Sequence, residues 1–171
     1  MAKLIPARGG QNVQEADFIC SWNDTMNDVS VLNASNPALS GVLKDMGAVT
    51  AGDVFKIMNM PPNAVLLGVE VQVEVAGVGP TAYTVELGHT TDGLSGTFAN
   101  SILGASDLKA AVGTIYVGVR TSAFIFPGLV SASPNDIYMR LIRSVAVATA
   151  GKFGVRVQFI TRGKVNEAYP A

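Results

Sequence analysis

The chain has 171 residues, of which 49% are hydrophobic and 15% carry a charge, and its formal net charge is −1 at pH 7. Charged side chains usually make up about 25% of a soluble domain, so we expect other subunits to cover much of this surface. The near-neutral charge argues against a nucleic-acid binder, and no apolar run approaches the roughly 20 residues of a membrane span.

Residues 1–15 show no strong periodicity and are expected to form an extended arm. The arm carries two basic residues, Lys3 and Arg8, and a small apolar anchor, Leu4-Ile5. Two interpretations stay open. The arm is either a frayed terminus or a segment that orders only against a partner, with its two cations pairing with the partner's carboxylates. It also lacks the long apolar run of a signal peptide.

Two segments in the first half of the chain show the two-residue alternation of strands. Residues 53–60 alternate and stop at Pro61-Pro62, because proline cannot continue a hydrogen-bonded ladder. Residues 67–75 place valines on one face and Glu70, Gln72 and Glu74 on the other. Such alternation predicts a half-buried strand of an antiparallel sheet and excludes an amphipathic helix.

Shorter elements follow in the middle of the chain. A strand is predicted over 81–87, and the glycine-rich turn at 77–80 predicts that it forms a hairpin with the 67–75 strand. The segment 106–111 is a candidate short helix, with Ser106 as its cap. Two more short strands are expected over 115–120 and 123–126.

The last predicted elements form a second hairpin. Strands over 137–147 and 153–161 flank a turn at 148–152, and Val155, Val157 and Phe159 alternate with polar residues. Residues 163–171 carry no strong periodicity and are expected to form a C-terminal tail.

About seven to nine short strands with regular turn signals predict an all-β fold, either a β-sandwich or a barrel. We expect an antiparallel β-sandwich of the jelly-roll type, built from two packed sheets. The predicted organisation is one domain over residues 16–162 with extended N- and C-terminal arms.

The chain offers few residues for catalysis or metal binding. It has one histidine, His89, and one cysteine, Cys20. A histidine-based metal site would need several histidines, and Cys20 has no basic partner nearby in the sequence, so we predict a small core residue there. The acidic segment 23–28 could offer oxygen ligands to Ca²⁺, but it lacks the glycine and the final glutamate of an EF-hand. We therefore predict no catalytic residue, no metal and no cofactor.

Aromatic side chains leave a carbohydrate-binding alternative open. Trp22 and Tyr169 could serve as platforms for a sugar, whereas Tyr83 and Tyr138 lie within apolar strand patterns and are expected in the core or in an interface. Tyr169, beside the terminal Pro170-Ala171, could instead anchor the C-terminal tail to a neighbouring subunit.

The middle of the chain, about residues 53–120, resembles virion proteins of tailed bacteriophages. The similarity lies in a strand–proline–strand unit over 55–75, a strand with a Thr-Thr-Asp-Gly turn over 83–93, and the Asp-Leu segment within 105–114. The resemblance implies a jelly-roll head decoration (cement) protein, which assembles as a homotrimer on the lattice of the major capsid protein.

The resulting hypothesis is a non-enzymatic decoration protein, made in the host cytoplasm and located on the capsid surface. Its partner-binding residues would be Lys3, Leu4, Ile5, Arg8 and Tyr169. No nucleic acid or membrane partner is expected. The alternatives are a head-fibre base or tail component of the virion, or a glycan-binding jelly-roll module.

Overall fold

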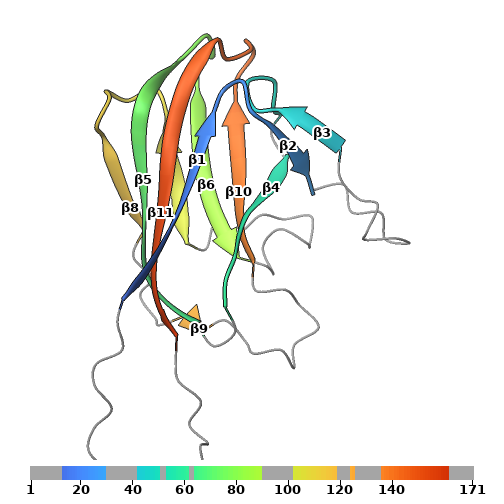
Figure 1. Cartoon of the computed structure of the whole chain (residues 1–171). Helices are drawn as coiled ribbons and strands as arrows, with labels where there is room; N and C mark the ends of the chain where they lie inside the picture. The colour runs from blue at the N-terminus through green and yellow to red at the C-terminus, as the bar shows by residue number, and fades with distance from the viewer. Residues whose placement is uncertain are drawn as a thin grey trace, which may run out of the picture.

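The computed structural model describes residues 13–29, 42–50, 53–61, 64–89, 102–118, 124–125 and 136–161. Within these residues all regular structure is β-strand, and the eleven strands form two antiparallel sheets that pack face to face (Figure 1). This confirms the predicted all-β sandwich.

The first sheet, called sheet one here, holds the long strands of the molecule. Its order is β1 (Gln14–Ser21), β11 (Ala150–Thr161), β5 (Ala64–Val78) and β8 (Ile115–Gly118), with β9 (Phe124–Ile125) also beside β5. Strand β1 begins at Gln14, inside the range predicted for the N-terminal arm.

The second sheet, sheet two, has six strands. Its order is β3 (Val42–Asp45), β2 (Thr25–Asp28), β4 (Val54–Asn59), β10 (Asp136–Arg143), β6 (Tyr83–His89) and β7 (Leu103–Asp107). Strand β4 ends directly before Met60 and Pro61, as the proline pair predicts.

The strand pairing is nested, as in one long hairpin rolled up on itself. Strand β1 pairs with β11, β4 with β10, β5 with β8, and β6 with β7, all antiparallel. Within each pair the two strands lie in the same sheet, and successive pairs alternate between sheet one and sheet two. This arrangement is a jelly roll.

The core lies between the two sheets and follows from strand alternation. Val69, Val71 and Val73 of β5 point inward and are fully buried. They pair in register with Val157, Val155 and Phe153 of β11, which are also buried. Sheet two closes the core with a second set of buried side chains, among them Phe55, Val85, Leu87, Met139 and Leu141.

The two predicted hairpins are wrong, although their strands are present. Strand β5 lies in sheet one and β6 in sheet two, so the turn after Val78 carries the chain across the sandwich. The same holds for β10 and β11. A tight turn between two alternating segments can join neighbouring strands of one sheet or carry the chain from one sheet to the other. The alternation is the same in both cases, because each strand buries one face. Pairing with partners distant in the sequence decides between them.

The predicted helix over 106–111 is also wrong. Ser106 lies in β7, is 2% exposed and pairs with Val85 of β6. Leu108 is buried in the core and donates its backbone N–H to the carbonyl of Tyr83. A single helical turn is unstable without tertiary support, and here the sheet edge offers the backbone better partners. Four strands, β1, β2, β3 and β7, were not predicted.

Candidate interaction surface

The outer face of sheet one carries a ladder of polar side chains across its strands. Arg156 of β11 donates to the Asp17 carboxylate of β1 at 3.1 Å, and Gln158 donates to Glu15 at 2.8 Å. At the other end of the face Lys152 lies 2.5 Å from Glu74 of β5. Cross-strand pairs of this kind fix the register and stabilise an exposed face modestly.

The electrostatic field of this face is negative. The hydrogen bond and charge of Asp17 raise the pKa of the Arg156 guanidinium, and the charges of Glu15 and Glu70 add to the effect. Glu70 pairs in register with Arg156, but no hydrogen bond or ion pair involves its carboxylate within the described residues. The face therefore offers a carboxylate to an external cation.

A shallow hollow lies in the middle of the same face, above Gly154 of β11. It has a volume of about 160 Å³, and its lining includes Ile19, Glu70, Gln72 and Glu74. The hollow exists because Gly154 has no side chain between Ile19 of β1 and Gln72 of β5, its two register partners.

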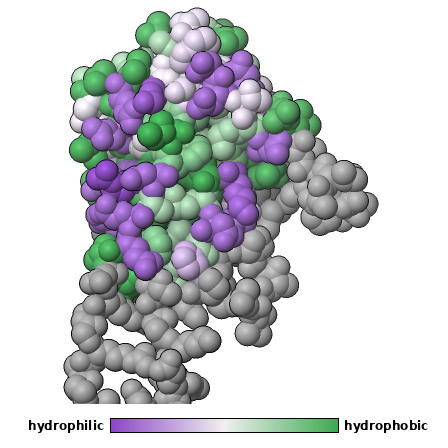
Figure 2. Space-filling view, in the orientation of Figure 1, coloured by the Kyte–Doolittle hydropathy of each residue, from purple (hydrophilic) through white to green (hydrophobic). Residues whose placement is uncertain are grey.

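Apolar side chains are exposed around this hollow. Ile19 is 55% exposed, and Ile115 and Val117 of β8 are 51% and 57% exposed. Seen from this side, hydrophilic and hydrophobic residues are interspersed rather than separated (Figure 2). The exposed aliphatic residues of this face make it a candidate surface for contact with another protein.

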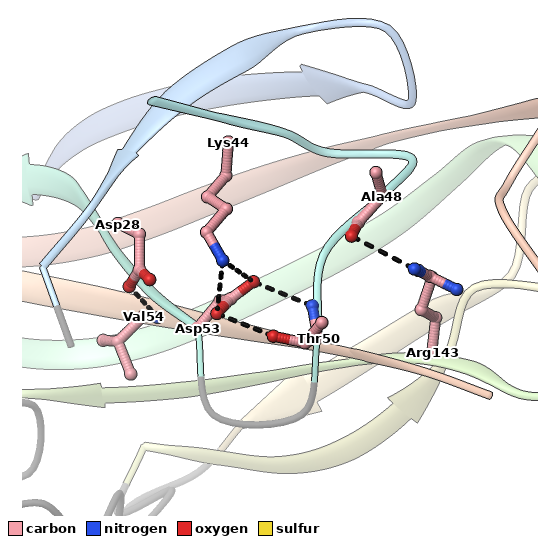
Figure 3. A network of polar contacts seen from close by, with 7 residues as sticks. All are labelled: Asp28, Lys44, Ala48, Thr50, Asp53, Val54 and Arg143. Carbon is pink, nitrogen blue, oxygen red and sulfur yellow. Dashed lines mark hydrogen bonds and ion pairs between the residues drawn. The ribbon is translucent and has the colours of Figure 1, made fainter. Parts of the chain in front are cut away.

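The outer face of sheet two is different, because four carboxylates of this sheet and its connections are buried and have polar partners within the described residues. Asp53 is 5% exposed; it accepts hydrogen bonds from Thr50 and forms an ion pair with Lys44 at 3.3 Å (Figure 3). Asp28 accepts the backbone N–H of Val54 at 3.0 Å, which ties β2 to β4.

Two further carboxylates of sheet two have partners on neighbouring strands. Asp136 forms an ion pair with Lys56 at 2.8 Å and accepts hydrogen bonds from Asn59 and from the hydroxyl of Tyr138. Burial, together with the charge of Asp136, raises the pKa of Tyr138. Glu86 accepts two hydrogen bonds from the guanidinium of Arg140. These groups hold the strands together and leave sheet one as the better candidate for contacts.

One end of the sandwich presents a strained, exposed valine. Val145 follows β10, is 95% exposed and has a φ of 53°, a left-handed conformation that β-branched residues rarely adopt. The turn is held in place because Ala146 donates to the carbonyl of Ser144, and Arg143 donates to the carbonyl of Val145. Arg143 also donates to the carbonyl of Ala48 (Figure 3).

We expect the Val145→Asn variant to gain about 1 kcal/mol in the free energy of unfolding, because asparagine tolerates the left-handed region far better than valine. Urea unfolding followed by circular dichroism measures the change. Val147→Asn is the matched control: Val147 is also exposed but has no positive φ. A Val145→Asn variant no more stable than the unmodified protein would contradict the strain.

The described residues hold few groups suited to catalysis. Cys20 is fully buried, which confirms the predicted core position, and burial raises the pKa of its thiol to about 12, so it is not a nucleophile near neutral pH. Tyr83 is buried and donates to the carbonyl of Met46 at 3.2 Å. No three His, Cys, Asp or Glu side chains of the described segments are placed to hold a metal ion.

The predicted partner-binding residues cannot be located in the fold. Lys3, Leu4, Ile5, Arg8 and Tyr169 lie outside the described residues, as does the side chain of His89. Trp22, the sugar platform of the glycan alternative, is partly buried and packs against the core.

The outer face of sheet one was not predicted as a site from the sequence. The alternation of Glu70, Gln72 and Glu74 was visible, but the neighbours of that strand were not. No helix in the described part of the chain is long and apolar enough to cross a membrane.

No protein-family model and no curated protein matches the sequence. Among solved structures, a chain in the capsid asymmetric unit of cyanophage Pam1 is 15% identical, with a TM-score of 0.58 and coverage of 95% of this chain and 94% of that one. This similarity establishes a shared fold.

Two further solved structures are more distant. A chain in the capsid of Ralstonia phage GP4 is 16% identical, with a TM-score of 0.47 and coverage of 95% of this chain and 93% of that one. A chain in the acid-stable capsid of Helicobacter pylori bacteriophage KHP30 is 11% identical, with a TM-score of 0.46 and coverage of 89% and 95%. Their TM-scores are too low to establish a shared fold.

Proposed function

We propose that this protein is a structural component of a bacteriophage virion, and that it decorates the outside of the capsid by binding the lattice of the major capsid protein. The observation that carries the proposal is the fold shared with a chain of the cyanophage Pam1 capsid over nearly the full length of both chains. The sequence resemblance over residues 53–120 points to the same class of protein.

The physical character of the molecule supports this role. A protein that strengthens a capsid needs a rigid core, a surface for self-association and adhesive contacts to the lattice. The nested strand pairing and the ion pairs of the buried carboxylates Asp136 and Glu86 in sheet two supply rigidity. The exposed aliphatic residues of sheet one supply a contact surface, and specific association generally buries about 1,600 Å² in total.

In the proposed assembly the protein is a homotrimer, with a domain over residues 16–162 and arms over 1–15 and 163–171. The basic and apolar residues Lys3, Leu4, Ile5 and Arg8 of the N-terminal arm, and Tyr169 of the tail, are the proposed partner contacts. A symmetric trimer would cover apolar surface that a monomer leaves in contact with water.

The test is to add the purified protein back to phage heads from which it has been removed. We expect it to bind the heads and to raise the temperature at which they release DNA. Heads that neither bind the protein nor gain heat resistance would overturn the proposal. The copy number per particle separates capsid decoration, with many copies, from a fibre base or tail component, with few copies at one vertex.

A further inference from the structure

We infer that the outer face of sheet one binds the N-terminal residues 1–12 of a second copy of this chain. This inference deepens the proposed homotrimer and rests on it. In the proposed trimer, the outer face of sheet one in each subunit binds the N-terminal arm of a neighbouring subunit.

Charge complementarity supports this contact. Within the described residues the face carries four carboxylates and two cations, a net charge of 2 − 4 = −2; they are Glu15, Asp17, Glu70, Glu74, Lys152 and Arg156. Both cations are already paired with carboxylates of the same face. Residues 1–12 carry Lys3 and Arg8 and no acidic residue, so the arm supplies the cations that this face lacks.

The size and the mixed lining of the hollow also fit the arm. The hollow above Gly154 is about 160 Å³, several times the volume of about 30 Å³ that one water occupies in the liquid. It has room for one aliphatic side chain against Ile19, and its charged lining includes the carboxylates of Glu70 and Glu74. Exposed Ile19 and Ile115 lie on its two sides in the same cross-strand row. Leu4-Ile5 of the arm, next to Lys3, places aliphatic groups beside a cation in the pattern that the hollow and Glu70 require.

The reach of the arm and the direction of β1 favour a contact between two copies. An extended chain rises about 3.3 Å per residue, so Lys3 and Arg8 can lie about 17 Å apart, enough to span the face from the row of Glu15 to the hollow. Strand β1 starts at Gln14 and runs across the face toward Ser21. Because β1 runs from Gln14 toward Ile19, an arm joined to its start would have to reverse direction to reach the hollow of its own subunit. The arm of a second copy starts elsewhere and is not bound to that reversal.

Disulfide trapping tests the contact directly. Ile5→Cys and Gln72→Cys are introduced together, because Gln72 lines the hollow, and the full-length protein is oxidised in solution. Cys20 is fully buried, so it does not take part. We expect disulfide-linked dimers and trimers on a non-reducing gel. The control pairs Ile5→Cys with Val145→Cys, at an exposed site outside this face, and we expect it to stay monomeric. Monomers only, whether open or linked within one chain, would overturn the inference.

A charge exchange tests the electrostatic part. Glu70→Lys and Lys3→Glu should each lower the trimer fraction measured by light scattering, and the double variant should recover it. Neither single change is expected to unfold the protein, because Glu70 is only partly buried and makes no ion pair within the described residues; circular dichroism verifies this. Single variants with an unchanged trimer fraction, or a double variant whose trimer fraction stays low, would contradict the proposed pairing of Lys3 with Glu70.

The outcomes keep the two proposals apart. Binding to heads without trapped arms would refute the arm contact and leave the decoration role in place. Trapped trimers that fail to bind heads would refute the decoration role and leave the arm contact in place.

Discussion

The Gly79→Ala variant is expected to lose about 3 kcal/mol in the free energy of unfolding. Gly79 has a φ of 108°, a conformation that costs an L-residue about 1–2 kcal/mol. An added Cβ would also collide with the backbone carbonyl oxygen of Val147, and overpacking of this kind typically costs about 1–3 kcal/mol. Urea unfolding measures the loss.

Variants at two other glycines separate the cost of the positive φ from the cost of the steric collision. Gly113 has a φ of 88° but open space around its Cβ position, so Gly113→Ala should lose about 1–2 kcal/mol from strain alone. Gly104 has neither a positive φ nor a neighbour within 4 Å, and Gly104→Ala should be neutral or slightly stabilising. Equal losses at all three positions would contradict the positive φ of Gly79 and its close approach to the Val147 carbonyl in the turn after β5.

The Phe55→Ala variant is expected to lose about 3–5 kcal/mol in the free energy of unfolding, a large part of the roughly 5–15 kcal/mol by which native domains are stable. Phe55 is fully buried and belongs to the core between the two sheets. Truncation removes its transfer free energy from water and leaves a cavity that the two sheets cannot close. Thermal and urea unfolding both report the change.

The matched control is Ile115→Ala on β8. Ile115 is 51% exposed on the outer face of sheet one, so its loss should change stability by no more than about 0.5 kcal/mol. A large loss at Ile115 in the monomer, or a small one at Phe55, would show that the buried and exposed faces have been exchanged.

Local patterns in the sequence predicted several elements correctly. The alternation over 67–75 identified the central strand of sheet one, since a two-residue period is set by the side chains of the strand itself. The proline pair after Met60 predicted the end of β4, because proline lacks the N–H that a ladder needs. From such segments the all-β class could be predicted.

Strands with weak alternation were missed. Strand β7, Leu-Gly-Ala-Ser-Asp, has no clear period and was in part assigned to a helix. It is a strand because its backbone pairs with β6 and because Leu103 and Leu108 pack into the core. Contacts distant in the sequence thus outweighed the local preference of this segment.

Burial on the outer face of sheet two also depends on tertiary contacts. Val54 and Tyr138 point away from the main core, yet each is only 4% exposed, and together with Val29 they form a second apolar cluster. Alternation shows which residues share a face, but it cannot show whether that face is covered.

The sequence by itself determined the strand content, the apolar stripe of β5 and the low charge of the surface, because these depend on residue type and on short-range geometry. Only the tertiary structure decided which strands pair and which face stays exposed. Pairing β1 with β11 joins segments more than a hundred residues apart. Glu70, the Gly154 hollow and the exposed Ile19 become one surface only because β11 lies between β1 and β5.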